Sequence, residues 1–235
     1  MKFLRRLLLI ILILIIIVGG VIFLNGYKLY KNTLETLSLS DKIAEIKSKD
    51  TYVSINDVQI DYINAVIAVE DHRYKEHGPV DYIAITRAIV SNIQAKELNE
   101  GGSTLTQQVA KNLYFIGEDD VVSRKIAEIL VAIDLENNYS KDDILEFYIN
   151  TIYFGEGYYG IREASNGYFK KEPKDLDLNE ATMLAGIPNA PSVYAPTINP
   201  TLALSRQKKV ISSMVEYGYL SQEEADSLLS QINNQ

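Results

Sequence analysis

The sequence predicts a mostly α-helical domain behind a single N-terminal transmembrane helix. Residues 7–24 are all apolar or glycine, and as a helix they would span about 27 Å, close to the thickness of a bilayer core. Beyond residue 50, apolar residues recur at three- and four-residue spacing in one segment after another. Alternating patterns typical of strands are scarce, and the best of them is 51–55.

The N-terminal apolar segment has the features of an uncleaved signal anchor. Lys2, Arg5 and Arg6 precede it, as in a signal peptide, but the apolar run is long for one and no A-x-A-like cleavage site follows it. The basic residues before the run predict a cytoplasmic N-terminus and a body outside the membrane. Tyr27 and Tyr30 are expected to lie in the membrane interface.

These features divide the chain into three parts. Residues 1–26 form a cytoplasmic tip and the transmembrane signal anchor, 27–50 form an amphipathic juxtamembrane connector, and 51–235 form one compact extracytoplasmic domain on this stalk. In the connector, Ser40 and the acidic Asp41 indicate a helix start. In the domain, apolar periodicity predicts helices at 58–74, 80–97, 103–115, 122–137, 141–151, 158–169, 178–187, 200–217 and 221–232.

Composition argues against several classes of function. The net charge of −8 in 235 residues makes the chain a poor general binder of nucleic acid, because its surface would repel phosphate. The absence of cysteine excludes disulfides, thiolate metal sites and a cysteine nucleophile. Two histidines without H-E-x-x-H spacing argue against a dedicated zinc site.

Glu70 is the first candidate for chemistry. The apolar stripe of the preceding helix continues to position 70, and a carboxylate on a core-facing stripe is costly unless it is paired or protonated. A carboxylate in such a place suits general acid or base catalysis. The alternative is purely structural, with Glu70 ending the stripe and pairing with Arg73 or Tyr74.

The segment GGSTLTQQ at 101–108 is the second candidate. Its two glycines lead into a helix whose free backbone N–H groups can bind an anion. On that helix Thr104, Gln107, Gln108 and Lys111 share one polar face, which suits a phosphate or sugar ligand. The alternative is a glycine turn before an ordinary amphipathic helix, and the segment lacks the P-loop pattern of nucleotide-binding proteins.

Glu128 is the third candidate. It precedes helical turns that are apolar on every side, so it is expected to be buried and to pair with Arg124 and Lys125. A structural ion pair is the alternative to a catalytic role. Together, two carboxylates, an anion-binding segment and several cations would suit sugar transfer from a phosphate leaving group, because one carboxylate can take a proton while cations stabilise the departing diphosphate.

Five segments between about residues 52 and 214 also resemble a known family. They are EDHRYKEHG at 70–78, GGSTLTQQVAKN at 101–112, RKIAE at 124–128, KDDILEFYINTIYFG at 141–155 and RQKKVISSM at 206–214. In order and spacing they resemble glycosyltransferase family 51, the peptidoglycan glycosyltransferases, in their monofunctional form. The resemblance implies a lysozyme-like fold with a large lobe, a smaller membrane-embedded lobe and a cleft between them.

The resemblance implies a role for each residue that matches a family motif. Glu70 matches the catalytic base, which takes the proton from the 4-hydroxyl of the acceptor sugar of lipid II, and Glu128 matches a second essential glutamate that helps to position the donor diphosphate. No metal ligand and no required cofactor is implied, although a divalent cation near the diphosphate stays open. The substrate-binding positions are matched by Asp71, Ser103, Gln108, Lys111, Asn112, Arg124 and Lys125.

Two further expectations come from the family pattern. In the segment 141–155, Tyr148 and Asn150 are expected to hold helices together. Asp120 stands where the family often has a diphosphate-binding arginine. If Asp120 faces the cleft, an arginine there would strengthen donor binding, whereas in solvent the change would be almost neutral.

The resemblance therefore implies an inverting hexosyltransferase of the plasma membrane that polymerises lipid II into β-1,4-linked glycan strands and releases undecaprenyl diphosphate. Its partners would be lipid II, the growing lipid-linked strand, the membrane and other cell-wall synthesis proteins, with no nucleic acid. Two alternatives stay open, a lysozyme-like lytic glycosidase and a catalytically silent cell-wall scaffold. No transpeptidase domain is expected, because the S-x-x-K match at 205–208 has no K-T-G partner.

Overall fold

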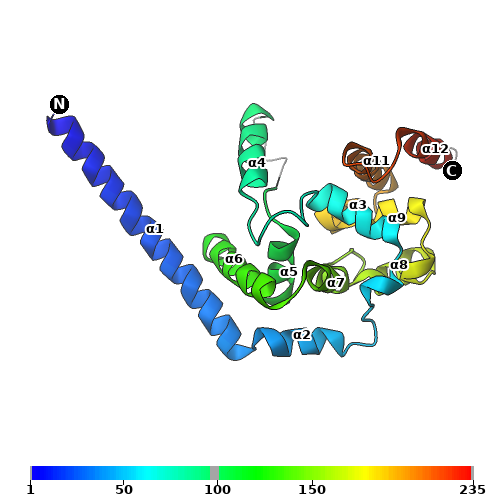
Figure 1. Cartoon of the computed structure of the whole chain (residues 1–235), viewed down its shortest axis with the longest axis horizontal. Helices are drawn as coiled ribbons and strands as arrows, with labels where there is room; N and C mark the ends of the chain where they lie inside the picture. The colour runs from blue at the N-terminus through cyan, green and yellow to red at the C-terminus, as the bar shows by residue number, and fades with distance from the viewer. Residues whose placement is uncertain (1, 96–100, 234–235) are drawn as a thin grey trace.

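Helices dominate the computed structural model of the protein, which describes residues 2–95 and 101–233 (Figure 1). Within those ranges there is no strand, and the β-type pairing is an isolated bridge between Tyr153 and Tyr159. The predicted mostly α-helical class behind one long apolar N-terminal helix is thus confirmed. The run 51–55 is irregular and leads into the 3₁₀ helix Ile55–Asp57.

The helices follow the predicted periodicity closely, and the expected residues 96 and 97 of one helix lie outside the described ranges. One boundary moves by four residues, because Asp71 leaves helical geometry directly after Glu70. The α-helices are α1 (Lys2–Thr36), α2 (Leu39–Lys47), α3 (Ile60–Glu70), α4 (Tyr82–Ala95), α5 (Leu105–Tyr114), α6 (Val121–Asn138), α7 (Lys141–Thr151), α8 (Ile161–Phe169), α9 (Leu178–Gly186), α10 (Pro191–Tyr194), α11 (Pro200–Glu216) and α12 (Gln222–Asn233).

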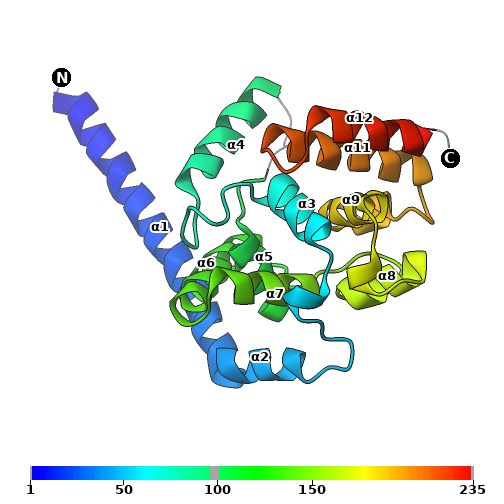
Figure 2. The same cartoon turned by 45° about the vertical axis from the view of Figure 1, so that its right-hand side comes forward.

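Two packed groups of helices surround the core (Figure 2). In one group α3 packs against α9 and α11, and in the other α5 packs against α6 and α7. The core between them contains large, fully buried side chains, among them Tyr62, Phe115, Phe147, Tyr148 and Phe154. Glu70, the last residue of α3, accepts a hydrogen bond from Gln108 of α5, so the two groups touch at this point.

Polar side chains of α7 hold the connection that precedes α3. Asn150 accepts a hydrogen bond from the backbone N–H of Val53 and donates one to its carbonyl oxygen, both at 2.8 Å. Glu146 accepts hydrogen bonds from the Tyr52 hydroxyl and the Ile55 N–H. Asn150 thus has the structural role expected of it, while Tyr148 contributes a fully buried ring.

Helix α1 is longer than the expected anchor, and its C-terminal part packs on α6. Tyr30 donates a hydrogen bond of 2.7 Å to Asp134 of α6, so its hydroxyl helps to hold the two helices together. Gly26 is buried in the same contact. Towards the N-terminus α1 projects away from the other helices, with its apolar side chains exposed (Figures 1 and 2).

Helix α4 presents a second exposed apolar surface. Figure 2 shows it standing apart from the group formed by α3, α9 and α11, on the side of the molecule from which α1 projects. We call this surface the α4 face, and its exposed residues are Tyr82, Ile83, Ile89, Val90 and Ile93. An apolar patch of this kind is typical of a membrane or protein contact.

A substitution at Gly26 tests the packing of α1 on α6. A Cβ atom there would lie 2.5 Å from the Ile126 Cβ and 2.9 Å from the Ser123 carbonyl oxygen, so Gly26→Ala should destabilise the contact by about 1–3 kcal/mol, as overpacking does. Gly20→Ala is the matched control, since nothing lies within 4 Å of its Cβ. Thermal unfolding in detergent should show a lower midpoint for the first variant alone, and equal midpoints would contradict the contact.

Candidate active site

Glu70 lies where two cavities meet. The larger, of about 680 Å³, is also lined by His72, Arg87, Arg206, Lys209 and Tyr217, and we call it the first cavity. The smaller, of about 260 Å³, is the second cavity, and its lining includes Lys111, Asn112, Lys125 and Glu128. Glu70, Ser103, Gln108 and Asn189 line both cavities. The Glu70 carboxylate can therefore contact a molecule bound in either cavity.

Both oxygens of Glu70 have partners from distant helices. Oε2 accepts a hydrogen bond of 2.9 Å from the Gln108 amide of α5, and Oε1 lies 3.3 Å from Nη2 of Arg206 of α11. The structural alternative, pairing with Arg73 or Tyr74, is wrong. Arg73 faces Glu76 and Asp81, while the Tyr74 hydroxyl donates to the carbonyl oxygen of Lys141.

Two buried tyrosines lie near Glu70. Tyr62 and Tyr148 are fully buried, and neither hydroxyl has a hydrogen-bond partner in the structure. Burial, and secondarily the negative charge of Glu70, raises the pKa of both phenols, so they stay neutral. Two neutral phenols thus lie near Glu70 in addition to its partners Gln108 and Arg206.

Glu128 is buried and has the partners that the sequence predicts. Its Oε1 lies 3.3 Å from Nε of Arg124, and its Oε2 lies 3.1 Å from Nζ of Lys125. Lys125 also donates a hydrogen bond of 2.7 Å to the Ser103 hydroxyl. One cation thereby joins α6 to the segment that precedes α5.

The structure gathers most of the predicted site residues around the second cavity. They are Glu70, Ser103, Gln108, Lys111, Asn112, Lys125 and Glu128. Arg124 lines neither cavity, since it pairs with Glu128 and donates to the carbonyl oxygen of Glu118. Asp71 does not line either of these two cavities, because it is buried and both its oxygens accept hydrogen bonds from the protein.

The expectation of an anion site at the start of α5 needs correction. Asp71 accepts the N–H of Leu105 at 3.0 Å, and the Thr104 hydroxyl accepts the N–H of Gln107, so these two backbone donors are taken by the protein itself. Thr104 and Gln107 are themselves buried, and both donate to the carbonyl oxygen of Pro79. Positive charge at this place comes instead from Lys111 and Lys125, which line the second cavity.

Arg206 and Asn189 are not among the residues that the sequence predicts for the site. Arg206 is 136 positions from its partner Glu70, so no local spacing could reveal the contact. Its place in the family-like segment 206–214 is the one available signal. Asn189 follows Pro188 in a short 3₁₀ helix, and no pattern in the sequence distinguishes it.

Asp120 faces solvent at the start of α6. Its carboxylate caps the helix by accepting hydrogen bonds from the N–H groups of Val122 and Ser123, at 3.2 and 3.1 Å. The pKa of the Asp120 carboxyl is lowered, most by a hydrogen bond from the Ser123 side chain and then by these two backbone hydrogen bonds. The acidic residue thus stabilises the helix that carries Lys125 and Glu128.

Replacing Asp120 tests this placement. Asp120→Arg should lower the unfolding temperature, because it removes the cap and places a positive charge at a helix N-terminus. It should leave the binding of a diphosphate-mimicking inhibitor unchanged. Asp120→Asn is the control, since asparagine also caps helices. A salt-sensitive gain of inhibitor affinity in the arginine variant would instead place position 120 in the cleft.

Comparison with known proteins identifies the family to which the chain belongs. The family described as Transglycosylase matches residues 39–215, which include every residue that lines the second cavity. The chain belongs to the transglycosylase family. This match extends over α2 and on to the end of α11, while α1 and α12 lie outside it.

Relatives within the transglycosylase family support the assignment. Penicillin-binding protein 1F of Bacillus subtilis is 41% identical over 213 residues, which cover 87% of this chain and 30% of the relative. Penicillin-binding protein 1A of Neisseria lactamica is 41% identical over 86% of this chain and 25% of its own length. The chain thus spans less than a third of these two relatives. A Cupriavidus necator protein provisionally named as a transglycosylase is 40% identical over 80% of this chain and 81% of the relative.

Proposed function

We propose that the protein is a peptidoglycan glycosyltransferase that polymerises lipid II into β-1,4-linked glycan strands by inverting transfer. The observation that carries this proposal is the position of Glu70 between two cavities, one of which is lined by Lys111 and Lys125. A transferase needs room for an acceptor and a donor on either side of its base. Membership of the transglycosylase family supports the same reaction class.

In this proposal Glu70 acts as the general base. It takes the proton of the acceptor 4-hydroxyl, whose oxygen forms a bond to the anomeric carbon of the donor sugar. The bond from that carbon to the diphosphate breaks on the opposite face, and undecaprenyl diphosphate leaves with the bonding electrons. Arg206 and Gln108 hold the two oxygens of Glu70 in place, so the base is oriented before the acceptor binds.

The departing diphosphate would lie in the second cavity. Lys111 and Lys125 supply positive charge there, where negative charge develops in the transition state. Each oxygen of Glu128 already faces a cationic side chain, so a divalent ion on this carboxylate would have to displace Arg124 or Lys125. Glu128 with these two partners does not fit a resident metal, and the proposed mechanism places none on it.

The membrane would supply the substrate. Helix α1 is long and apolar enough to cross a bilayer, and the α4 face offers a second apolar surface beside it. We propose that the N-terminus lies in the cytoplasm and the site outside, with the α4 face dipping into the outer leaflet. Lipid II and the growing lipid-linked strand would then reach the cavities from the membrane, where other cell-wall synthesis proteins also work.

The lytic glycosidase is the weaker candidate. Hydrolysis of a glycosidic bond releases no diphosphate, so a glycosidase has no need of the lysines Lys111 and Lys125 that line the second cavity. Incubation of the full-length protein with purified glycan strands, without lipid II, separates the two activities. New reducing ends from such strands would indicate the glycosidase, and strand synthesis from lipid II alone would indicate the transferase.

Glu70→Gln tests the role of the base. The amide is nearly isosteric but cannot accept the proton, so polymerisation of lipid II should fall by about 10²–10⁴-fold while the unfolding temperature changes little. Glu223→Gln on exposed α12 is the matched control and should polymerise as the wild type does. Wild-type turnover in the Glu70 variant at neutral pH would refute the assigned role.

A further inference from the structure

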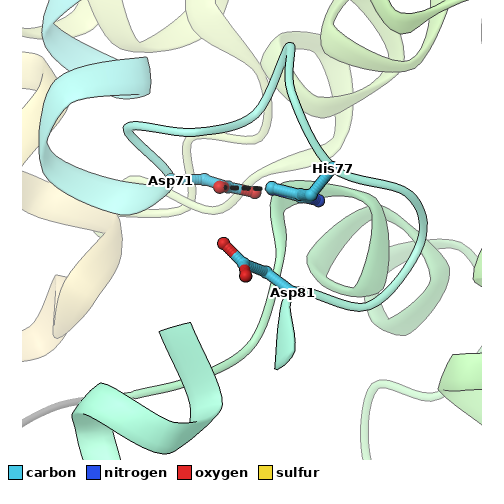
Figure 3. A group of neighbouring side chains, drawn as sticks. All are labelled: Asp71, His77 and Asp81. Carbon is cyan, nitrogen blue, oxygen red and sulfur yellow. Dashed lines mark hydrogen bonds and ion pairs between the residues drawn. The ribbon is translucent and has the colours of Figure 1, made fainter. Parts of the chain in front are cut away.

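A buried charged cluster lies between α3 and α4, beside the proposed base. It consists of Asp71, His77 and Asp81, whose side chains are all about 95% buried or more (Figure 3). One atom of each lies within 4.8 Å of the others, and Figure 3 shows the Asp81 carboxylate directed towards the Asp71–His77 pair. Two carboxylates and an imidazole at this distance can hold a divalent metal ion or an additional proton.

The hydrogen bonds of His77 favour an additional proton on its imidazole ring over a bound metal ion. Its Nε2 lies 2.7 Å from Oδ1 of Asp71, and its Nδ1 faces the carbonyl oxygen of Gly78. Asp71 uses its other oxygen to accept the N–H of Leu105 at the start of α5, where a helix N-terminus favours the anion. Both His77 nitrogens thus face acceptors, and an imidazole ring donates from both only when it is protonated. An imidazolium has no lone pair left for a metal ion.

We propose that His77 is a positioning residue whose imidazolium holds Asp71 against the start of α5 and thereby aligns Glu70 with Gln108. Asp71 directly follows Glu70 in the chain, and the helix that begins at Leu105 carries Gln108. When His77 loses a proton it keeps one N–H for two acceptors, so one of the two hydrogen bonds is lost. The link to catalysis rests on the proposed function, whereas the protonation of His77 can be measured without it.

The charged groups around His77 set the pH at which its imidazolium loses a proton. Burial by itself would lower the pKa of His77, but the hydrogen bond to Asp71, the Gly78 carbonyl and the charge of Asp71 together raise it above its ordinary value. Lys141 of α7 opposes the rise, while Asp81 lies close to Arg73 on the same loop. Because the folded pKa exceeds the unfolded value of about 6.5, the contribution to stability is complete below that pH and is lost as pH rises through the folded pKa.

The second histidine provides an internal reference. The chain has only two histidines, and burial followed by the charge of Arg87 lowers the pKa of His72. In the full-length protein labelled with ¹⁵N-histidine, His77 should titrate at higher pH than His72 and should carry protons on both nitrogens at neutral pH. His72→Gln assigns the signals. A neutral His77 at pH 7, or a stoichiometric shift of its signal on adding Zn²⁺ that EDTA reverses, would overturn the proposal.

His77→Gln tests the consequence for catalysis. Its amide can donate to Asp71 at every pH, but it loses the ion pair, so we expect kcat for lipid II to fall roughly tenfold to a hundredfold with KM little changed. The wild type should lose activity and unfolding temperature as pH rises through the pKa of His77, and the variant should lack this alkaline decline. Persistence of the same decline in the variant would refute the positioning role.

Asp81→Asn is the second variant, should His77→Gln fail to fold. Asparagine can still cap α4 through the Ile83 and Ala84 N–H groups that Asp81 now binds, but one negative charge near His77 is removed. The pKa of His77 and the alkaline decline should both move to lower pH, and an unchanged pKa would count against the charge network. If both titrations behave as expected while no variant or wild type polymerises lipid II, the proposed function fails and the protonated pair stands.

Discussion

The carboxylate of Asp71 is the contact on which the arrangement of the site depends. One oxygen accepts a hydrogen bond from His77 and the other accepts the first backbone N–H of α5, so a single buried side chain joins two packed groups of helices. The same residue ends α3, because its backbone (φ −158°, ψ 71°) lies outside helical geometry. Glu70 is therefore held as the last residue of α3, with its largely buried side chain between the two cavities.

A second set of charges organises the other side of the second cavity. Glu128 is buried beneath Arg124 and Lys125, and Lys125 reaches on to Ser103. Removing one partner of such a buried group leaves an uncompensated charge, which is far costlier than the pair is stabilising. Lys125 is consequently held in place before any diphosphate enters, so this part of the cavity needs little rearrangement to bind an anion.

The sequence predicts local features well and distant contacts poorly. Apolar periodicity places the longer helices of the body, although it misses the short α10, and the spacing within α6 predicts the pairing of Glu128, because both depend on neighbours within one turn. It cannot predict the partners of Glu70, since Arg206 approaches from α11 only after the chain has folded. Nor can it predict that Asp71 and the Thr104 hydroxyl accept two of the backbone N–H groups expected to bind an anion at the start of α5.

The connection between the anchor and the domain follows from the same dependence on tertiary contacts. The sequence suggests a stalk, but α1 continues past residue 26 and packs through Gly26 and Tyr30 on α6. Helix α6 also carries Lys125 and Glu128, so the apolar helix is attached directly to the donor side of the proposed site. A rigid attachment of this kind would fix the height of the second cavity above the bilayer. The diphosphate of a membrane lipid also lies at a fixed height above the bilayer. The packing of α1 on α6 would hold the second cavity at that same height.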